Sequence, residues 1–218
     1  MNKKKVPDVV IKRLPRYYRY LGELLKQGST RISSGYLSEK MGVTASQIRQ
    51  DFNYFGGFGQ QGYGYNVEYL YKEIGSILGI NDGYKTIIVG AGHLGHALAN
   101  HNAFEKRGFK IAAIFDNDPN KVGELINGIP VLHTDELESY IKTNGIKIAI
   151  MALPKAATAE MADKLADYGI EGLCNFSYVE LKSKKIEVEN VHFTDSLMTL
   201  AYKIKRNNTD DGEDEGKQ

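Results

Sequence analysis

The most informative segment of the chain reads Lys85-Thr86-Ile87-Ile88-Val89-Gly90-Ala91-Gly92-His93-Leu94-Gly95. Its first five residues are rich in β-branched side chains and predict a short buried strand. The glycines that follow have the spacing G-x-G-x-x-G, and a helical pattern then covers His96–Asn102. A strand, this glycine pattern and a helix in that order predict the first βαβ unit of a Rossmann fold.

Each glycine of the pattern has a physical role. Gly90 makes the tight turn, Gly92 leaves room for a pyrophosphate against the backbone, and Gly95 lets the helix pack closely on the strand. The second predicted strand, Ile111–Phe115, ends at Asp116, 21 residues after Gly95. An acidic side chain at that position binds the ribose hydroxyls of the adenosine and repels a 2′-phosphate. The sequence therefore predicts NAD and NADH as ligands, in preference to NADP(H).

The rest of the second half continues to alternate strands and helices. Strands are predicted at Lys147–Ala152 and Gly172–Phe176, with a helix at Ala156–Tyr168 between them. Because ligands of such sheets lie at the carboxyl ends of the strands, we expect the cofactor to contact the residues that follow them. Asn175 could bind the carboxamide or the ribose, or it could only close a turn. The predicted cofactor contacts are Gly90, Ala91, Gly92, His93, Leu94, Gly95, Asp116, Asn117, Asp118, Lys121, Met151, Ala152, Leu153, Pro154, Asn175, Phe176 and Ser177.

The first 84 residues have a different pattern, three helices followed by a glycine-rich loop. The first helix is predicted over Arg16–Gln27. The second begins at Ser33-Ser34 and is closed by Gly42, and Thr44 then caps the third helix, Ala45–Asn53. Two helices joined by a short turn that contains glycine are the signature of a helix-turn-helix.

The third helix and the loop after it both suit DNA. The helix places Ile48 and Phe52 on one side, facing a core, and its amide and guanidinium side chains on the other faces, where they can bind base edges or phosphates. A plain amphipathic helix with a solvated face is the alternative. The loop Gly56–Tyr65 holds five glycines with aromatic residues between them, which predicts a hairpin, or wing, whose backbone can approach DNA closely. The alternative is a flexible linker, but linkers seldom carry a Phe and two Tyr.

Charge is distributed unevenly along the chain. Residues 1–84 carry 12 Lys and Arg against 7 Asp and Glu, residues 85–207 carry 15 of each, and residues 208–218 carry 1 against 5. The basic N-terminal end predicts a polyanionic partner, although a solvated, frayed terminus would explain the charge equally well. The acidic end lacks apolar residues, so we expect residues 208–218 to be disordered.

The composition, 42% hydrophobic and 25% charged, is ordinary for a globular protein. No stretch reaches the roughly 18 apolar residues of a membrane span, and no apolar segment follows the basic run Lys3-Lys4-Lys5, so we expect no membrane partner and no signal peptide. Cys174 is the lone cysteine, which fits a reducing cytoplasm. In its predicted buried strand, a packed core thiol is favoured over a peroxide-sensing one.

An oxidoreductase would need a second lobe for its substrate and a proton donor or acceptor. The five histidines, at positions 93, 96, 101, 133 and 192, show no base with an orienting partner, and His133 follows a predicted strand far from any obvious partner. The DNA-binding pattern uses the first 84 residues, and too few remain at the C-terminal end for a substrate lobe. We therefore predict that the cofactor is a signal and that the protein is not an enzyme.

These two halves, in this order, resemble the Rex family of redox-sensing repressors. The resemblance covers nearly the whole chain, up to the acidic end. Besides the glycine motif, its most specific stretches are Leu14–Leu21, Thr44–Asp51, Tyr54–Gly56, Gly62–Tyr65, Phe115–Pro119 and Asn175–Ser177.

The resemblance implies a homodimer in which a C-terminal helix, here about Phe193–Lys205, is swapped between the two domains of the partner. It implies repression of fermentation and respiration genes, with DNA bound in the apo or NAD form and released by NADH. It also implies an operator that is an inverted repeat, one winged helix on each half-site. Phe193 matches a family aromatic near the partner's nicotinamide and joins the predicted cofactor contacts. With the helix and wing, the predicted DNA contacts are Lys12, Arg13, Arg16, Ser33, Ser34, Tyr36, Thr44, Ala45, Gln47, Arg49, Gln50, Asn53, Tyr54, Phe58, Gln60, Gln61 and Gly62.

The chain departs from the family pattern at four positions. Many members carry Lys or Arg at the positions of Gln50 and Gln61, so phosphate contacts are fewer here. The family's switch uses an Asp on the swapped helix, an Arg in the first helix and a Tyr near the cofactor. Arg19 keeps the Arg, but His192 and His101 replace the Asp and the Tyr. Because neutral His cannot form a buried Asp–Arg pair, the switch needs other contacts in this chain.

We therefore predict an α/β protein with four parts: a winged-helix domain over 1–84, a doubly wound, mostly parallel Rossmann domain over 85–190, a swapped helix over 191–207 and a disordered acidic tail over 208–218. Two alternatives remain open. One is an NAD-dependent oxidoreductase with an appended domain that resembles a DNA-binding one. The other is a CoA- or nucleotide-binding domain of the succinyl-CoA synthetase type, which has the same glycine loop and gives Asp116 no role.

Overall fold

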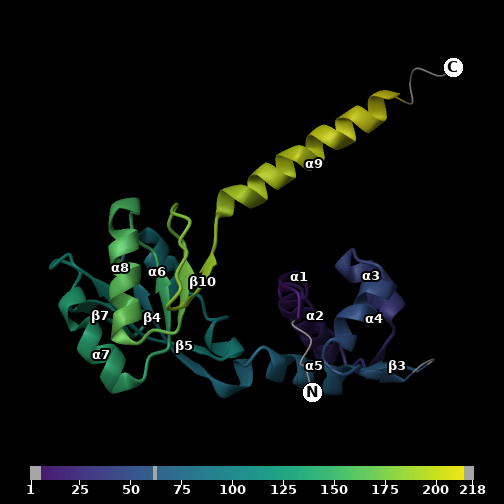
Figure 1. Cartoon of the computed structure of the whole chain (residues 1–218), viewed down its shortest axis with the longest axis horizontal. Helices are drawn as coiled ribbons and strands as arrows, with labels where there is room; N and C mark the ends of the chain where they lie inside the picture. Colours follow the sequence, from purple (N-terminus) through teal and green to yellow (C-terminus); the bar gives the residue numbers. More distant parts are fainter. Residues whose placement is uncertain (1–5, 61–62, 214–218) are drawn as a thin grey trace. The chain divides into compact units, whose positions relative to one another are not determined.

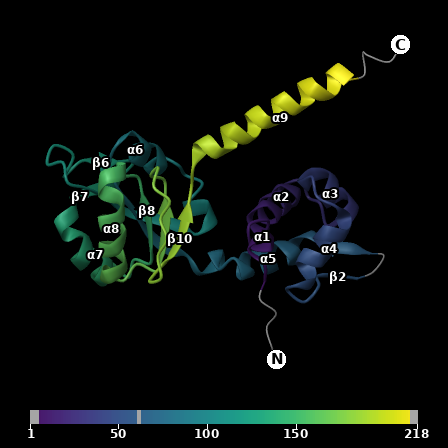
Figure 2. The same ribbon diagram turned by 45° about the horizontal axis from the view of Figure 1, so that its top comes forward.

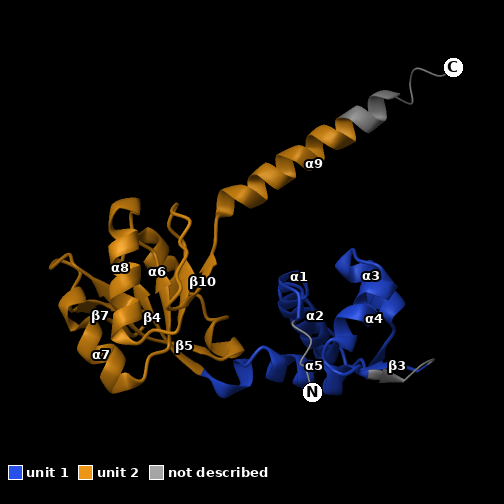
Figure 3. Cartoon of the chain, in the orientation of Figure 1, with its two compact units in different colours: residues 1–83 blue, residues 84–218 orange. Residues whose placement is uncertain are grey.

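A computed structural model describes residues 6–60 and 63–213. For residues 59–60 and 209–213 it describes the backbone only. Contacts divide the chain into two units, residues 1–83 and 84–218 (Figure 3). The boundary expected after residue 84 differs from the observed one by a single residue. Each unit has its own hydrophobic core and is described by itself.

Unit 1 is helical with a small sheet. Its elements are α1 (Asp8–Ile11), α2 (Leu14–Lys26), β1 (Arg31–Ile32), α3 (Ser34–Met41), α4 (Ala45–Asn53), β2 (Gly59–Gln60), β3 (Gly64–Asn66), α5 (Val67–Ile77) and η1 (Ile80–Asp82). The sheet has the order β1-β3-β2 and both of its pairs are antiparallel. The pairing of β2 with β3 confirms the predicted hairpin, whose Gln61 and Gly62 lie outside the described residues.

The predicted helix-turn-helix is confirmed. The hydroxyl of Ser33 accepts a hydrogen bond from Tyr36 N at the start of α3, and the hydroxyl of Thr44 accepts one from Gln47 N at the start of α4. Gly42, between them, takes the left-handed conformation at φ +66° and ends α3. The bounds of α4 are those predicted from the sequence.

Three expectations for unit 1 need correction. The first long helix begins at Leu14 instead of Arg16, because Pro15 fits the first turn of a helix. A short helix, α1, precedes it. The expectation of three helices and a loop also missed α5, whose Val67, Leu70 and Ile74 are fully buried at helical spacing.

A buried ionic network joins α4 to α2. Asp51 of α4 is 1% exposed and lies between Arg13 and Tyr17. The guanidinium of Arg13 donates two hydrogen bonds of 2.7 Å to the Asp51 carboxylate, and the Tyr17 hydroxyl donates a third of 2.8 Å. The hydrogen bond and charge of Asp51 outweigh burial and raise the pKa of Arg13. Burial, with Asp51 second, raises the pKa of Tyr17. The Arg13–Asp51 ion pair, together with the Tyr17 hydrogen bond, fixes how α4 is rotated against α2.

Unit 2 is a three-layer α/β domain followed by a long helix (Figure 1). Its elements are β4 (Tyr84–Val89), α6 (His93–Ala99), η2 (Glu105–Arg107), β5 (Phe109–Asp116), β6 (Leu125–Ile126), β7 (Ile129–His133), η3 (Thr134–Glu136), α7 (Leu137–Asn144), β8 (Ile148–Met151), α8 (Lys155–Tyr168), β9 (Gly172–Asn175), β10 (Glu187–Asn190) and α9 (Phe193–Glu213).

The sheet of unit 2 has the order β10-β9-β8-β4-β5-β7-β6, and only the β6–β7 pair among its described strands is antiparallel. Alternate residues of β4 face opposite sides. Ile87 and Val89 join a core with α7 and α8, and Ile88 joins a second core with α6. Among the parallel strands, β4 comes first in the chain and lies in the middle of the sheet. The next two, β5 and β7, lie on one side of it, and the last three, β8, β9 and β10, lie on the other. This is the doubly wound Rossmann order. The predicted fold class is confirmed.

The last helix is longer than expected. It was predicted to end near Lys205, before a disordered tail, but α9 runs to Glu213 and includes residues 208–213. Helix propagation costs little once a helix has formed, so polar residues alone did not end it. Figure 2 shows α9 as one unbroken rod.

We expect Asp51→Ala to lower the stability of unit 1 by about 3 kcal/mol, because it leaves the Arg13 guanidinium, whose side chain is 12% exposed, without its partner. Urea unfolding followed by circular dichroism measures this change. Glu68→Ala, which removes the exposed Glu68–Lys72 pair of α5, is the matched control and should leave the transition nearly unchanged. Equal midpoints for both variants would contradict the role given to the network.

Candidate nucleotide-binding site and DNA interface

The carboxyl ends of four parallel strands meet at one edge of the unit 2 sheet. The chain order reverses between β4 and β8, which pair side by side, and sheets of this kind bind their ligands beyond the strand ends at such a point. The residues at this edge are Gly90 after β4, Asp116 at the end of β5, Ala152 after β8 and Phe176 after β9. The topology therefore brings together the segments that the sequence predicted as cofactor contacts.

The glycine loop has the shape that a phosphate needs. Gly90 has φ +107°, and a Cβ on it would lie 2.5 Å from the carbonyl oxygen of Ala152. A Cβ on Gly95 would lie 1.9 Å from the carbonyl oxygen of Gly90, so only glycine lets α6 approach β4 this closely. At Gly92, in contrast, a Cβ would meet no atom within 4 Å. This open side of the loop fits the pyrophosphate of a dinucleotide.

The helix after the loop begins earlier than predicted. It was expected over His96–Asn102, whereas α6 is His93–Ala99 and is preceded by Gly92. His93, Leu94 and Gly95 therefore lie in its first turn, and His101 and Asn102 lie beyond its end. The second half of the glycine pattern is thus part of the helix, because the loop turns directly into it.

Asp116 is held rigidly at the end of β5. Its Oδ2 accepts hydrogen bonds from Ala91 N at 2.7 Å and from Lys121 Nζ at 3.2 Å, and its Oδ1 accepts one from Asp118 N at 2.9 Å. Burial opposes the charge of this residue, which is 8% exposed, but the bonds from Asp118, Ala91 and Lys121 together lower the pKa of Asp116 below its ordinary value. The Asp116 carboxylate is therefore ionised at neutral pH and can accept hydrogen bonds from the ribose hydroxyls.

The segments after β8 and β9 lie at the same edge of the sheet, beyond the end of β4. Met151 is buried, Ala152 and Leu153 are half-buried, and Pro154 precedes α8. Phe176 contacts Phe193, at the start of α9, with ring centroids 5.7 Å apart. The first residue of α9 thus lies at the edge where the nicotinamide is expected.

Asn175 closes a turn. It is fully buried, its amide nitrogen donates to Val179 O and to Asn190 Oδ1, and its oxygen accepts from the backbone nitrogen and hydroxyl of Ser177. Of the two roles left open by the sequence, the structure favours this one. Asn175 shapes the loop that carries Phe176 and Ser177.

The polar face of α4 is exposed at the surface of unit 1. All four polar residues that the sequence singled out are exposed: Gln47, Arg49, Gln50 and Asn53. Arg49 Nη1 lies 3.0 Å from Ser34 Oγ, a contact that joins α4 to the start of α3. As the second helix of the helix-turn-helix, α4 is the expected recognition helix. Ser33 and Thr44 use their hydroxyls as helix caps, and Ala45 starts α4.

The predicted contacts from other elements fall into two groups. Lys12, Arg16 and Tyr36 are exposed, and Tyr54 and Phe58 are half-buried. Arg13 donates its guanidinium to Asp51 inside the unit, a role in the fold that the sequence did not reveal, and its DNA contact stays a prediction. The sequence could not reveal this pair because its members are 38 residues apart.

Two exposed basic residues that the sequence analysis did not name lie beside predicted DNA contacts. Arg31 of β1 donates to Tyr63 O beside the wing, with its guanidinium 6.0 Å from the Tyr63 ring. Lys40 of α3 lies 5.6 Å from the Tyr36 ring. A signal existed in both cases, a cation close in sequence to a predicted contact, Ser33 or Tyr36.

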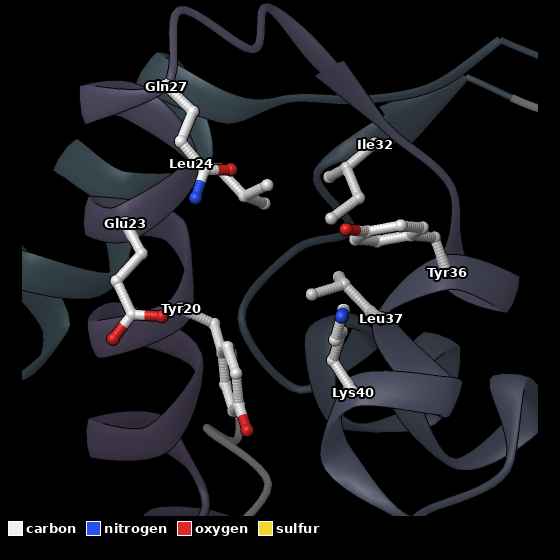
Figure 4. Close-up of a pocket in the computed structure, with 8 residues that line it drawn as sticks. All are labelled: Tyr20, Glu23, Leu24, Gln27, Ile32, Tyr36, Leu37 and Lys40. Atoms are coloured by element: carbon white, nitrogen blue, oxygen red, sulfur yellow. The ribbon is translucent and has the colours of Figure 1, made fainter.

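Figure 4 shows a pocket of unit 1 between α2 and α3. Its volume is about 130 Å³, and Leu24, Ile32 and Leu37 supply its apolar wall. Glu23 and Lys40 stand on opposite sides of it, so the pocket has no single charge preference. We assign it no ligand.

The three residues at the positions of the family's switch, of which only Arg19 keeps the family residue, have local partners. Arg19 lies 5.9 Å from the Tyr20 ring, and the His101 ring contacts Phe104 edge-on at 5.1 Å. His192 Nε2 lies 3.2 Å from Glu180 Oε2.

The expectation that His133 has no near partner is wrong. His133 stands in register with Asp116 on the neighbouring strand, and its Nδ1 lies 3.1 Å from Asp135 Oδ2. Its ring also accepts a hydrogen bond from Asp135 N and caps η3, a structural task. No group of three potential metal ligands occurs among the described residues.

The thiol of Cys174 is poorly suited to redox chemistry. Burial, with a smaller contribution from Glu189, raises its pKa to about 11. A thiol that stays protonated is a weak nucleophile, which favours the core role predicted for it.

Among the described helices, none is long and apolar enough to cross a membrane.

Relatives of this chain were found along nearly its whole length. A redox-sensing transcriptional repressor Rex of Caldicellulosiruptor saccharolyticus is 50% identical over 203 residues, which are 93% of each chain. The Rex protein of Thermoanaerobacter pseudethanolicus is 53% identical over 206 residues, covering 94% of this chain and 92% of its own. This chain belongs to the Rex family.

The solved structures agree. The crystal structure of RSP, a Rex-family repressor, matches with a TM-score of 0.88 and 48% identity over 94% of this chain and 97% of RSP. RSP in complex with β-NAD⁺ and operator DNA matches over 99% of this chain and 100% of its own, and RSP with β-NADH over 96% and 99%, both with a TM-score of 0.88. Their identities are 48% and 47%.

Two family models match separate parts of this Rex protein. Residues 5–53 match "Putative DNA-binding protein N-terminus" and residues 81–179 match "CoA binding domain". The second name is close to one of the alternatives raised by the sequence, but the Rex relatives cover the same residues. Because the relatives are named as transcriptional repressors, the prediction that the protein is not an enzyme is confirmed, and the oxidoreductase alternative is set aside.

We expect Gly92→Ala to weaken NADH binding about tenfold or more without loss of stability. Its φ is −80°, a value that alanine adopts, and the added methyl group meets no protein atom but occupies the space left for the pyrophosphate. Gly95→Ala is the matched comparison and should destabilise unit 2, because its Cβ clashes with Gly90 O. Titration of NADH fluorescence and thermal unfolding separate the two effects. Normal NADH affinity in Gly92→Ala would place the pyrophosphate elsewhere.

Proposed function

We propose that this Rex protein is a cytoplasmic homodimer that represses transcription by binding an inverted-repeat operator and leaves it when NADH binds. The observation that carries the proposal is the combination, in one chain, of an exposed recognition helix and a glycine-loop site with an ionised Asp116. It is supported by the match of nearly the whole chain to RSP, whose structures hold NAD⁺ with operator DNA, or NADH.

The residues of unit 2 bind and orient the nucleotide. Gly90–Gly95 receive the pyrophosphate, Asp116 accepts the adenosine ribose hydroxyls, and 151–154 with 176–177 surround the nicotinamide end. The oxidised and reduced forms differ by one positive charge on the nicotinamide. A wall that contains Leu153 and Phe176 buries the neutral ring of NADH without a charge to desolvate.

The response follows from differential affinity. NADH can release DNA only if it binds one shape of the dimer more tightly than the other. A 100-fold loss of operator affinity needs about 2.7 kcal/mol of coupling. One aromatic ring that packs well or poorly near Phe193 is of that order.

The homodimer is supported by the surface of α9. Every residue of α9 from Phe193 to Asn208 is exposed, including the large apolar Phe193, Leu197, Leu200 and Ile204. Their spacing of four, three and four residues places them on one face, as in the seam of a helix pair. A stripe of this kind needs a partner, and in the proposed dimer a second copy covers it by exchange of α9.

The proposed switch is tested by operator binding with each nucleotide titrated separately. Fluorescence anisotropy on an inverted-repeat duplex should show tight binding by the apo and NAD forms and at least a tenfold loss with NADH. Arg49→Ala should lose about 10- to 100-fold in operator affinity with unchanged NADH affinity, because Arg49 lies on the exposed face of α4.

Lys72→Ala is the matched control for that variant, because it removes an exposed cation of α5 in the same unit. The same operator affinity with an empty, oxidised or reduced pocket would refute the proposed function. A normal affinity of Arg49→Ala would remove only Arg49 from the interface.

The double substitution Leu197→Glu, Leu200→Glu should turn the dimer into a monomer, because it places two charges in the apolar stripe of α9. Sedimentation velocity at micromolar concentration measures the change. Thr199→Glu adds a charge on the opposite side of the same helix and should remain dimeric. A doubly substituted protein that still sediments as a dimer would exclude this face as the interface.

A further inference from the structure

An ammonium group stands beside the carboxylate that is expected to select the cofactor. Lys121 Nζ lies 3.2 Å from Asp116 Oδ2 and 3.7 Å from Asp118 Oδ2. The Lys121 side chain is 33% exposed and that of Asp116 is 10% exposed, so the pair is partly shielded from solvent. The loop between them is short and closed, because Lys121 N also donates to Asp118 O.

The pair changes what Asp116 can do. A lone carboxylate at this position binds the ribose hydroxyls and repels a 2′-phosphate. Here two carboxylates and one ammonium share the same place, so the local charge is negative but reduced. The ammonium is also within reach of the position that a 2′-phosphate would take, since it already touches the oxygen that the ribose must approach.

We propose that Asp116 and Lys121 together set the choice between NADH and NADPH. While Asp116 is charged, it holds Lys121, and the ribose of NADH is bound by the carboxylate. When the charge of Asp116 is removed, Lys121 keeps only its longer contact with Asp118, at 3.7 Å, and can turn to the 2′-phosphate of NADPH. Lys121 is thus a specificity-determining residue. This inference rests on the proposed function, which places the adenosine ribose at Asp116.

The simpler reading is that Lys121 forms an ordinary surface ion pair that contributes little. The two readings differ once Asp116 is made neutral. A free ammonium that binds phosphate forms a charge-assisted contact, which strengthens binding about 10- to 100-fold. A surface lysine with no role would leave NADPH affinity the same whether it is present or not.

The test is a double-mutant cycle with Asp116→Asn and Lys121→Met in the full chain. Asn keeps the size of Asp and one oxygen that can accept from Ala91 N, but its amide nitrogen cannot accept the bond from Asp118 N, so one of the two loop contacts is lost. Dissociation constants for NADH and NADPH are measured from the fluorescence of the reduced nicotinamide. Operator binding by each variant in the absence of nucleotide reports that the protein is folded, and Lys110→Met removes an exposed lysine of β5 as the control.

The unaltered protein should prefer NADH, and Asp116→Asn should gain at least tenfold in NADPH affinity while it loses NADH affinity. The double variant should lose that gain, and Lys110→Met should change neither constant. Equal NADPH affinity in Asp116→Asn and in the double variant would overturn the role of Lys121. An unaltered protein that binds neither nucleotide would overturn the proposed function itself, and this inference with it.

Discussion

The nucleotide site depends on the close approach of α6 to the end of β4. The Gly90 carbonyl occupies the place where a side chain of residue 95 would lie, so both positions must remain glycine for the loop to keep its path. The same loop presents Ala91 N to Asp116, 25 residues later, at 2.7 Å. The phosphate-binding loop and the ribose-binding carboxylate are therefore one rigid assembly, in which each fixes the other. A change at either glycine would displace Asp116 as well as the pyrophosphate.

Local signals made much of the fold predictable. The bounds of α4 could be found from the sequence because Thr44 caps it and Gly42 ends the helix before it, and both effects involve neighbouring residues. The order of strands and helices around Gly90–Gly95 was predictable for the same reason. The start of α6 was not, because a glycine pattern reads as a loop even where its second half is helical. The helix α5 was missed although its apolar residues have helical spacing, because it directly follows the glycine-rich wing and was interpreted as part of that loop.

In the candidate site, too, the features set by neighbouring residues could be predicted and those set by distant residues could not. Asp116 was found from its distance along the chain to Gly95, a spacing set by one βαβ unit. The pairings of Arg13 with Asp51 and of Asn175 with Asn190 depend on residues brought together by the whole fold. Arg13 was therefore predicted as a DNA contact without its partner Asp51, and Asn175 was left with two roles. Lys121 is only five residues after Asp116, but its side chain would be placed differently by a helix, a turn or a loop between them. The contact could therefore not be predicted from the spacing.

The buried network around Asp51 limits how a redox signal can reach DNA. Because Tyr17 of α2 and Arg13, just before α2, hold Asp51, and Phe52 packs in the same core as Tyr17, α4 cannot rotate or slide without breaking buried polar contacts. Unit 1 must then respond as a rigid body. In the proposed mechanism, NADH cannot act by distorting the recognition helix of one protomer. It acts on the spacing between two such helices, which must match successive major grooves of an inverted repeat. The dimer is thus a physical requirement of the switch, since a single rigid winged helix would bind a half-site equally well in both redox states.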